Sequence, residues 1–145
     1  MGIQLTPEEK FEVFGEGYVD YEEEAEQRWG ETDEWKLSQQ RAAKYTKEDW
    51  VRIKAEADAL DRRIGDAIAA GAAADSEQAM DVAEAHRRHI SHYFYECSYK
   101  MHTNLAEMYI ADERFTEYYE KIVPGGAVWF REAILANARR AGEPR

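Results

Sequence analysis

The fold class is decided by residues 46–71, which read TKEDWVRIKAEADALDRRIGDAIAAG. Thr46 can cap a helix, and the two acidic residues that follow suit the positive end of a helix dipole. Apolar residues recur at steps of three and four, the spacing of one helix face: Trp50, Ile53, Ala57, Leu60, Ile64 and Ile68. Gly71 can end this helix, because glycine is common just after the last helical residue. The stretch predicts one long amphipathic helix from Thr46 to about Ala70.

Sequence signals on the N-terminal side predict three shorter helices. Thr6-Pro7-Glu8-Glu9 is a capping box with proline at the first helical position, and Gly15 ends this segment. Asp20 and Thr32 can each cap a further helix, and the pair Trp29-Gly30 separates the two. We expect these helices over residues 7–14, 21–29 and 33–44.

After Gly71, the sequence predicts helix over a long stretch that has few residues able to end it. Asp75-Ser76-Glu77-Gln78 predicts a helix start, and residues 72–123 contain neither Gly nor Pro. The helical signal therefore runs to about Ile110, with or without a break near residues 95–98. In a continuous helix, one broad face would hold Ile90, Phe94, Cys97, Met101, Leu105 and Met108.

Two more helices are expected before the end of the sequence. Asp112-Glu113 predicts a short helix to about Ile122. Residues 124–126, Pro-Gly-Gly, form a turn, and the last helix runs from Ala127 to about Arg140. No alternating strand pattern is present, so the sequence predicts an all-α fold.

Composition narrows the classes of partner. The 145 residues suit one domain, and the net charge of −11 argues against nucleic acid or an anionic membrane surface. The sequence has no apolar run of about 18 residues and no basic, apolar leader at its start. A single cysteine fits a reducing compartment. We expect a cytoplasmic protein that is a monomer when isolated.

The N-terminal third differs from the rest. Residues 1–45 carry short, highly charged segments punctuated by glycine, and such short helices are marginal without tertiary packing. We interpret residues 1–45 as a mobile lid and residues 46–145 as the helical core of a single ligand-binding domain.

The sequence has few motifs of the kinds that bind metals or carry out catalysis. His86, His89 and His92 are three residues apart and drift around a helix, so we interpret them, with His102 further on, as solvated or half-buried histidines. No Gly-rich phosphate loop, serine-centred elbow or CxxC motif occurs. We expect no metal, no cofactor and no enzymatic activity.

Cys97, the one cysteine, has two interpretations. Its spacing from Phe94 and Met101 is ordinary for a core residue, which the pattern alone favours. It can also be a nucleophile, because Lys100 and His102 would favour its thiolate, although Glu96 opposes ionisation. The tyrosines and methionines around it suit a cleft for a bulky ligand as well as a core.

Six stretches carry a resemblance to a known family: GIQLTPEEKFEVFG (2–15), YTKEDW (45–50), DSE (75–77), YECSYKMHT (95–103), EMYIADERF (107–115) and REAILANA (131–138). Together they resemble the TipAS family, the thiopeptide-antibiotic recognition domains of MerR-family transcriptional activators. The resemblance covers essentially the whole sequence.

The resemblance implies a globin-like, all-α fold without haem, with a cleft that binds thiopeptides and an N-terminal segment that closes over the ligand. It places Cys97 at the cysteine that adds covalently to a dehydroalanine of the antibiotic, a stoichiometric step without turnover. The same match implies that further ligand-binding positions are Tyr95, Met101, His102, Met108, Tyr109, Asp112 and Phe115. The family's winged helix-turn-helix is not in this sequence, so no DNA binding by this chain alone is expected. The domain would sense the antibiotic for an activator or sequester it to give resistance.

Three alternatives remain open from the residues. The chain could bind other bulky amphipathic compounds without covalent capture, with Cys97 as a core residue. It could be a protein–protein interaction module that pairs through its N-terminal helices. A haem-binding globin is the third alternative, although the histidines have no independent support as axial ligands.

Overall fold

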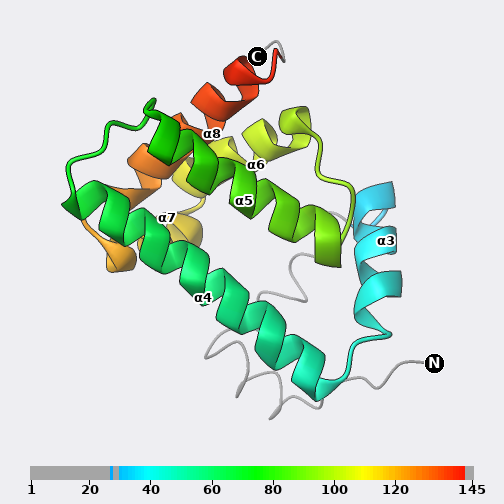
Figure 1. Ribbon diagram of the computed structural model, residues 1–145. Helices are drawn as coiled ribbons and strands as arrows, with labels where there is room; N and C mark the ends of the chain where they lie inside the picture. The colour runs from blue at the N-terminus through cyan, green and yellow to red at the C-terminus, as the bar shows by residue number, and fades with distance from the viewer. Residues whose placement is uncertain (1–26, 28–29, 143–145) are drawn as a thin grey trace. The chain divides into compact units, whose positions relative to one another are not determined.

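The computed structural model describes residue 27 and residues 30–142, and α-helix is the regular structure within them (Figure 1). The helices are α3 (Asp33–Ala42), α4 (Lys47–Ala69), α5 (Glu77–Tyr93), α6 (Tyr99–Ala111), α7 (Glu113–Ile122) and α8 (Gly126–Arg140). The all-α prediction is confirmed. The helices expected over residues 7–14 and 21–29 lie outside the described residues, and so does most of the expected lid. The division into a lid and a core stays a prediction.

Helix ends follow the capping signals of the sequence. The Thr46 hydroxyl accepts a hydrogen bond from the Asp49 amide at 3.2 Å, and the Asp49 carboxylate accepts one from the Thr46 amide at 2.9 Å. Gly71 ends α4 with φ at +80°, where the amides of Gly71 and Ala72 bond back to Ile68 and Ala67. Thr32 caps α3 by accepting from the Trp35 amide. These local interactions place α3 and α4 within two residues of their predicted bounds.

The long helical signal after Gly71 is interrupted at residues 94–98. α5 ends at Tyr93, and Ser98 caps α6 with an extended backbone while its hydroxyl accepts from the Met101 amide at 3.0 Å. Cys97 therefore lies in a connection between two helices, and it does not share a continuous helix face with Ile90 and Met101. The break that the sequence left open is present.

The chain divides into two compact units. In the first, residues 1–57 and 90–96, the described part holds α3, the first half of α4 and the end of α5. Trp50, Ile53 and Tyr93 form its core, with Tyr45 packed against them. The Tyr45 hydroxyl donates to the Tyr93 carbonyl at 2.6 Å, and Arg41 donates to the Ser91 carbonyl at 2.8 Å. These bonds join the α3 end to the α5 end.

The second unit, residues 58–89 and 97–145, is built around α8. α6, α7 and α8 pack against one another, and most of the α8 side chains are buried, including Phe130 and Ile134. Alanines allow the helices to approach closely, and the fully buried ones are Ala67, Ala79, Ala83, Ala106 and Ala133. No helix of the described residues has the length and apolar character needed to cross a membrane.

The corner between α7 and α8 depends on a glycine. A Cβ atom on Gly126 would lie 2.5 Å from the Tyr119 carbonyl oxygen, closer than any side chain permits. The Glu120 carboxylate accepts hydrogen bonds at 3.1 Å from the amides of Gly125 and Ala127, which satisfies two donors at the start of α8. The close approach at Gly126 and the two hydrogen bonds from Glu120 together determine where α8 begins.

Candidate functional site

Cys97 is completely buried: its exposed fraction is 0%. Its thiol lies 3.8 Å from the Ser98 carbonyl oxygen, to which the S–H is a weak donor. Its own carbonyl oxygen accepts a hydrogen bond at 2.8 Å from Nη1 of Arg87, a residue of α5. In this structure the thiol is covered, and an arginine holds the backbone beside it.

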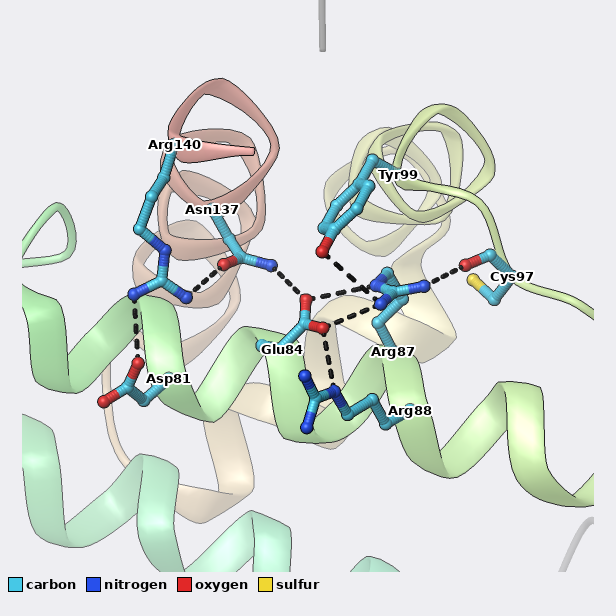
Figure 2. A network of polar contacts seen from close by, with 8 residues as sticks. All are labelled: Asp81, Glu84, Arg87, Arg88, Cys97, Tyr99, Asn137 and Arg140. Atoms are coloured by element: carbon cyan, nitrogen blue, oxygen red, sulfur yellow. Dashed lines mark hydrogen bonds and ion pairs between the residues drawn. The ribbon is translucent and has the colours of Figure 1, made fainter. Parts of the chain in front are cut away.

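Arg87 makes four hydrogen bonds and one cation–π contact, and the hydrogen bonds are drawn in Figure 2. Its Nε and Nη2 donate to the two Glu84 carboxylate oxygens at 3.1 and 2.7 Å. Nη1 donates to the Cys97 carbonyl, and Nη2 also lies 3.4 Å from the Tyr99 hydroxyl. The guanidinium carbon sits 4.1 Å from the centre of the Tyr99 ring, a cation–π distance. The planar fork of arginine is what lets one side chain serve these partners together.

Glu84 is the centre of this network and joins α5 to α8. Its carboxylate also accepts from Arg88 at 2.9 Å and from the buried Asn137 amide at 3.0 Å. Burial opposes ionisation of the carboxyl, but the hydrogen bonds from Arg87, Asn137 and Arg88 outweigh it and lower the pKa of Glu84 to about 2. Glu84 is therefore fully ionised at neutral pH, and its charge is matched by the arginines.

The network continues along α8 to a second ion pair. Arg140 donates to the Asn137 side-chain oxygen at 2.6 Å and pairs with Asp81 at 3.0 Å. Figure 2 shows the path from Asp81 through Arg140, Asn137, Glu84 and Arg87 to Cys97. The position of the Cys97 backbone is thereby linked to the packing of α8 on α5.

A pair of histidines lies in the same unit. Nδ1 of His86 and Nε2 of His102 are 2.9 Å apart, and their rings are stacked with an interplanar angle of 22°. Phe130 packs edge-on against His86, with ring centres 5.0 Å apart. Burial, with a small contribution from His89, lowers the pKa of His86 to about 4, and burial beside His86 lowers the pKa of His102 well below its usual value. Both imidazoles are therefore neutral at pH 7.

The histidine prediction was partly wrong. His92 is exposed and His86 and His89 are half-buried, as expected, but His102 is 1% exposed and hydrogen-bonded. Among the residues that the structure describes, Nδ1 of His102 has no hydrogen-bond partner. His102 contributes to the core at the start of α6, a position that its sequence neighbours did not indicate.

The remaining predicted ligand residues fall into separate groups. Cys97, Met101 and His102 lie around the start of α6. Near its end, Tyr109 packs 5.5 Å from Phe115 of α7, and Asp112 caps α7 by accepting from the Arg114 amide at 3.0 Å. Met108 packs against the same core. Seven positions, about 10 Å of helix, separate Met101 from Met108 and His102 from Tyr109. His86 packs against both His102 and Tyr109 and so lies between the two groups.

Tyr95 belongs to the first unit and is half-buried. The two α6 groups belong to the second unit. The ligand-binding role of all eight predicted residues stays a prediction.

Sequence reasoning missed Arg87, Glu84 and Asn137. The available signal was the Glu84–Arg87–Arg88 spacing, three and four residues apart on one helix, which is typical of a surface ion pair. That spacing could not reveal that Arg87 reaches the Cys97 carbonyl or that Asn137 meets the same carboxylate from α8.

The chain is an all-α domain with one covered thiol, and comparison with known proteins assigns its family. Residues 21–137 match the TipAS antibiotic-recognition domain. The chain is 57% identical over 141 residues to the HTH-type transcriptional activator TipA of Streptomyces coelicolor and of Streptomyces lividans, covering 97% of this chain and 56% of each relative. It is 34% identical over 108 residues to the HTH-type transcriptional activator mta of Bacillus subtilis, covering 74% of this chain and 41% of that protein.

Two solved structures are also similar to this chain. One is TipAS of Streptomyces lividans in complex with nosiheptide, from a thiopeptide antibiotic multidrug resistance system, with a TM-score of 0.87 and 56% identity over 97% of this chain and 99% of that one. The other is the antibiotic-binding domain of a TipA-class multidrug resistance transcriptional regulator, with a TM-score of 0.58 and 53% identity over 63% of this chain and 98% of that one.

The chain belongs to the TipAS antibiotic-recognition domain family. Its fold is that of TipAS, which confirms the fold expected from the resemblance. The chain spans about half, 56%, of the length of the TipA proteins it matches.

Proposed function

We propose that this chain binds thiopeptide antibiotics of the nosiheptide and thiostrepton class. The observation that carries the proposal is the match to TipAS in its nosiheptide complex, at a TM-score of 0.87 over 97% of the chain. At 56% identity and this TM-score, the chain shares its fold with a protein whose structure holds such a ligand. The tyrosines and methionines of α6 and the aromatic residues of α7 suit a large, flat, mostly apolar molecule.

Covalent capture by Cys97 is the second part of the proposal. The Cys97 sulfur, as a thiolate, forms a bond to the terminal CH2 carbon of a dehydroalanine, and the double-bond electrons move to the α-carbon. That carbon takes a proton from water, and the thiol proton passes to solvent. Nothing is oxidised or reduced, and no group leaves. One protein is consumed for each antibiotic, so this is capture and not enzymatic turnover.

Burial of Cys97 sets a condition on this step. A thiol with an exposed fraction of 0% cannot meet an electrophile until its surroundings move. Binding raises the local concentration of the electrophile, so a slow, intermittent exposure of the thiol is sufficient. The same burial favours an alternative, non-covalent recognition of bulky amphipathic compounds with Cys97 as a core residue.

For the biological role we propose sensing of the antibiotic for a transcriptional activator, because the relatives are activators of roughly twice this length. Sequestration of the antibiotic, which would give resistance, uses the same chemistry. The net charge of −11 supports a chain that does not itself bind DNA. We further propose that it acts in the cytoplasm as a monomer.

Intact-mass spectrometry after incubation with nosiheptide tests both parts. We expect the protein to gain the mass of one antibiotic, and the Cys97→Ala variant to show no adduct while still binding in a fluorescence titration. Binding without an adduct in the wild type would support the non-covalent alternative. An absence of binding at micromolar concentrations would reject recognition itself.

A further inference from the structure

We propose that Arg87 is a positioning residue that holds Cys97 in its buried place, so that the thiol becomes reactive only when the contact between Arg87 and the Cys97 carbonyl opens. The proposal deepens the covalent capture proposed above and rests on it for its biological meaning. It assigns regulation of the thiol to a residue that lies ten positions away in the sequence.

The Cys97 carbonyl lies just before the start of α6. Ser98 is the cap of α6, and the Ser98 carbonyl accepts the first helical hydrogen bond, from the His102 amide at 2.9 Å. The Cys97 carbonyl comes one residue earlier, outside the helical ladder. Arg87 donates a hydrogen bond to this carbonyl at 2.8 Å. Loss of this donor would remove a charge-assisted hydrogen bond from the backbone beside the thiol.

Arg87 is itself held on two sides by its neighbours. Its side chain is only 16% exposed, two of its nitrogens are engaged by Glu84, and its guanidinium lies on the Tyr99 ring. A side chain fixed on two sides loses little further freedom when it binds a third partner. Arg87 therefore acts as a fixed point to which the Cys97 backbone is attached, and not as a mobile surface charge.

The neighbouring Arg88 provides a matched control. It donates to the same Glu84 carboxylate at 2.9 Å, yet its side chain is 75% exposed. Figure 2 shows its guanidinium directed away from Cys97. Arg87 and Arg88 thus share a charge, a helix and a carboxylate partner, and they differ in the contact with the Cys97 backbone.

The test is alkylation of the antibiotic-free protein with iodoacetamide, followed by intact mass. Cys97 is the one cysteine of the chain, so the thioether that forms as iodide leaves reports on this residue alone. We expect wild type to react far more slowly than the urea-unfolded chain. Arg87→Met should react at least about ten-fold faster than wild type, as expected for loss of a charge-assisted hydrogen bond. Arg88→Met should stay within about two-fold of wild type.

A series of urea concentrations below the unfolding transition separates positioning from general destabilisation. Alkylation through a local opening is nearly independent of urea, whereas alkylation through global unfolding accelerates steeply with urea. We expect the extra reactivity of Arg87→Met to be present at zero urea and flat. Arg87→Lys, which keeps the charge but not the fork, should fall between Met and wild type. Tyr99→Leu, which removes the ring under the guanidinium, should raise the rate several-fold.

The outcomes are decisive without the antibiotic. Equal rates in wild type, Arg87→Lys and Tyr99→Leu would overturn the proposal, and so would a wild-type thiol that reacts as fast as the unfolded chain. An increase that follows urea in parallel with global unfolding would overturn it as well. Failure of nosiheptide binding, measured separately, would reject the proposed function and leave the Arg87 result standing.

Discussion

His86 and His102 share a hydrogen bond of 2.9 Å between Nδ1 and Nε2, which joins α5 to the first turn of α6. The bond requires one ring to donate an N–H and the other to accept, so each ring carries one proton. Tyr109 and Phe130 pack against His86, and the charges of Arg87 and Glu84 lie near His102. Protonation would put a charge on a pair whose burial favours the neutral form.

The histidine pair should make the protein acid-sensitive. Burial lowers the pKa of His86 to about 4 in the folded protein. As the pH falls below about 6.5, the unfolded chain takes up this proton first, so the free energy of unfolding decreases until the pH approaches 4. We expect the histidine pair to make the free energy of unfolding about 1–2 kcal/mol lower at pH 5 than at pH 7. Urea titrations monitored by circular dichroism measure the change.

The variant His102→Gln is the control for acid sensitivity. Glutamine can still hydrogen-bond but does not titrate, so the variant should be less stable at pH 7 and lose less stability between pH 7 and 5. His92→Gln, at an exposed position, should keep the wild-type slope. A slope unchanged in His102→Gln would contradict this assignment.

Glu84→Gln should be strongly destabilising. The change removes a charge that Arg87, Arg88 and Asn137 share, and it leaves an arginine with 16% exposure without its counter-ion. We expect the free energy of unfolding to fall by about 2–4 kcal/mol at pH 7. Since the pKa of Glu84 is held near about 2, the wild-type contribution is complete above about pH 4.5 and is lost as the pH falls toward 2.

Glu107→Gln is the comparison for this loss. Glu107 pairs with Arg131 at 2.9 Å, but its side chain is 52% exposed. Exposed ion pairs of this kind contribute about 0–1 kcal/mol. Equal losses for the two glutamate variants would show that Glu84 acts as an ordinary surface charge.

Gly126→Ala should disturb the corner between α7 and α8. Its methyl group would lie 2.5 Å from the Tyr119 carbonyl oxygen, which is backbone and cannot move independently of α7. We expect a loss of about 2–3 kcal/mol, measured by thermal or urea unfolding. Gly65→Ala is the matched variant, because its Cβ would meet a side-chain methyl of Ile122 at 3.3 Å and alanine favours helix. That variant should be close to neutral, and a larger loss at Gly65 would refute the argument.

Tyr45→Phe should loosen the attachment of α3 in the first unit. The hydroxyl donates to the Tyr93 carbonyl at 2.6 Å, and the ring packs edge-on to Trp50 with centres 5.5 Å apart. Phenylalanine keeps the ring contact and loses the hydrogen bond, which is worth about 1 kcal/mol. Hydrogen exchange of the α3 amides should accelerate about five-fold.

Tyr93→Phe provides the contrast for α3. It removes the hydroxyl that bonds to the exposed Glu56 and contacts Arg52, and it keeps the Tyr93 carbonyl that accepts from Tyr45. We expect little change in α3 exchange. If the two variants accelerate exchange equally, the Tyr45 hydroxyl is not the specific link.

Local signals predicted the fold well where they act over a few residues. Thr46, Gly71 and Ser76 form the caps expected of them, since a cap needs partners only three or four positions away. The end of α5 at Tyr93 had no such mark, because no Gly or Pro occurs there. Part of what fixes the chain between α5 and α6 is the Arg87 contact to the Cys97 carbonyl, which is a property of the folded molecule.

The candidate site came from the resemblance and not from periodicity, and its ligand-binding role stays a prediction. Spacing alone favoured Cys97 as core, and the structure indeed buries it, while the resemblance supplied the capture chemistry that remains to be tested. The polar network could not be predicted, because Asn137 lies 53 positions from Glu84 and only the packing of α8 on α5 brings them together. Long-range hydrogen bonds leave no periodic trace in a sequence.

The complete burial of Cys97 also has a consequence for the lifetime of the thiol in a cell. Oxidation to a sulfenic acid and exchange with glutathione both require an accessible sulfur, so a covered thiol is spared these reactions between encounters with a ligand. For a domain proposed to react once per molecule, every oxidised copy would be a lost copy. Shielding the sulfur keeps the population reduced, and the cost is a slower reaction with the intended electrophile.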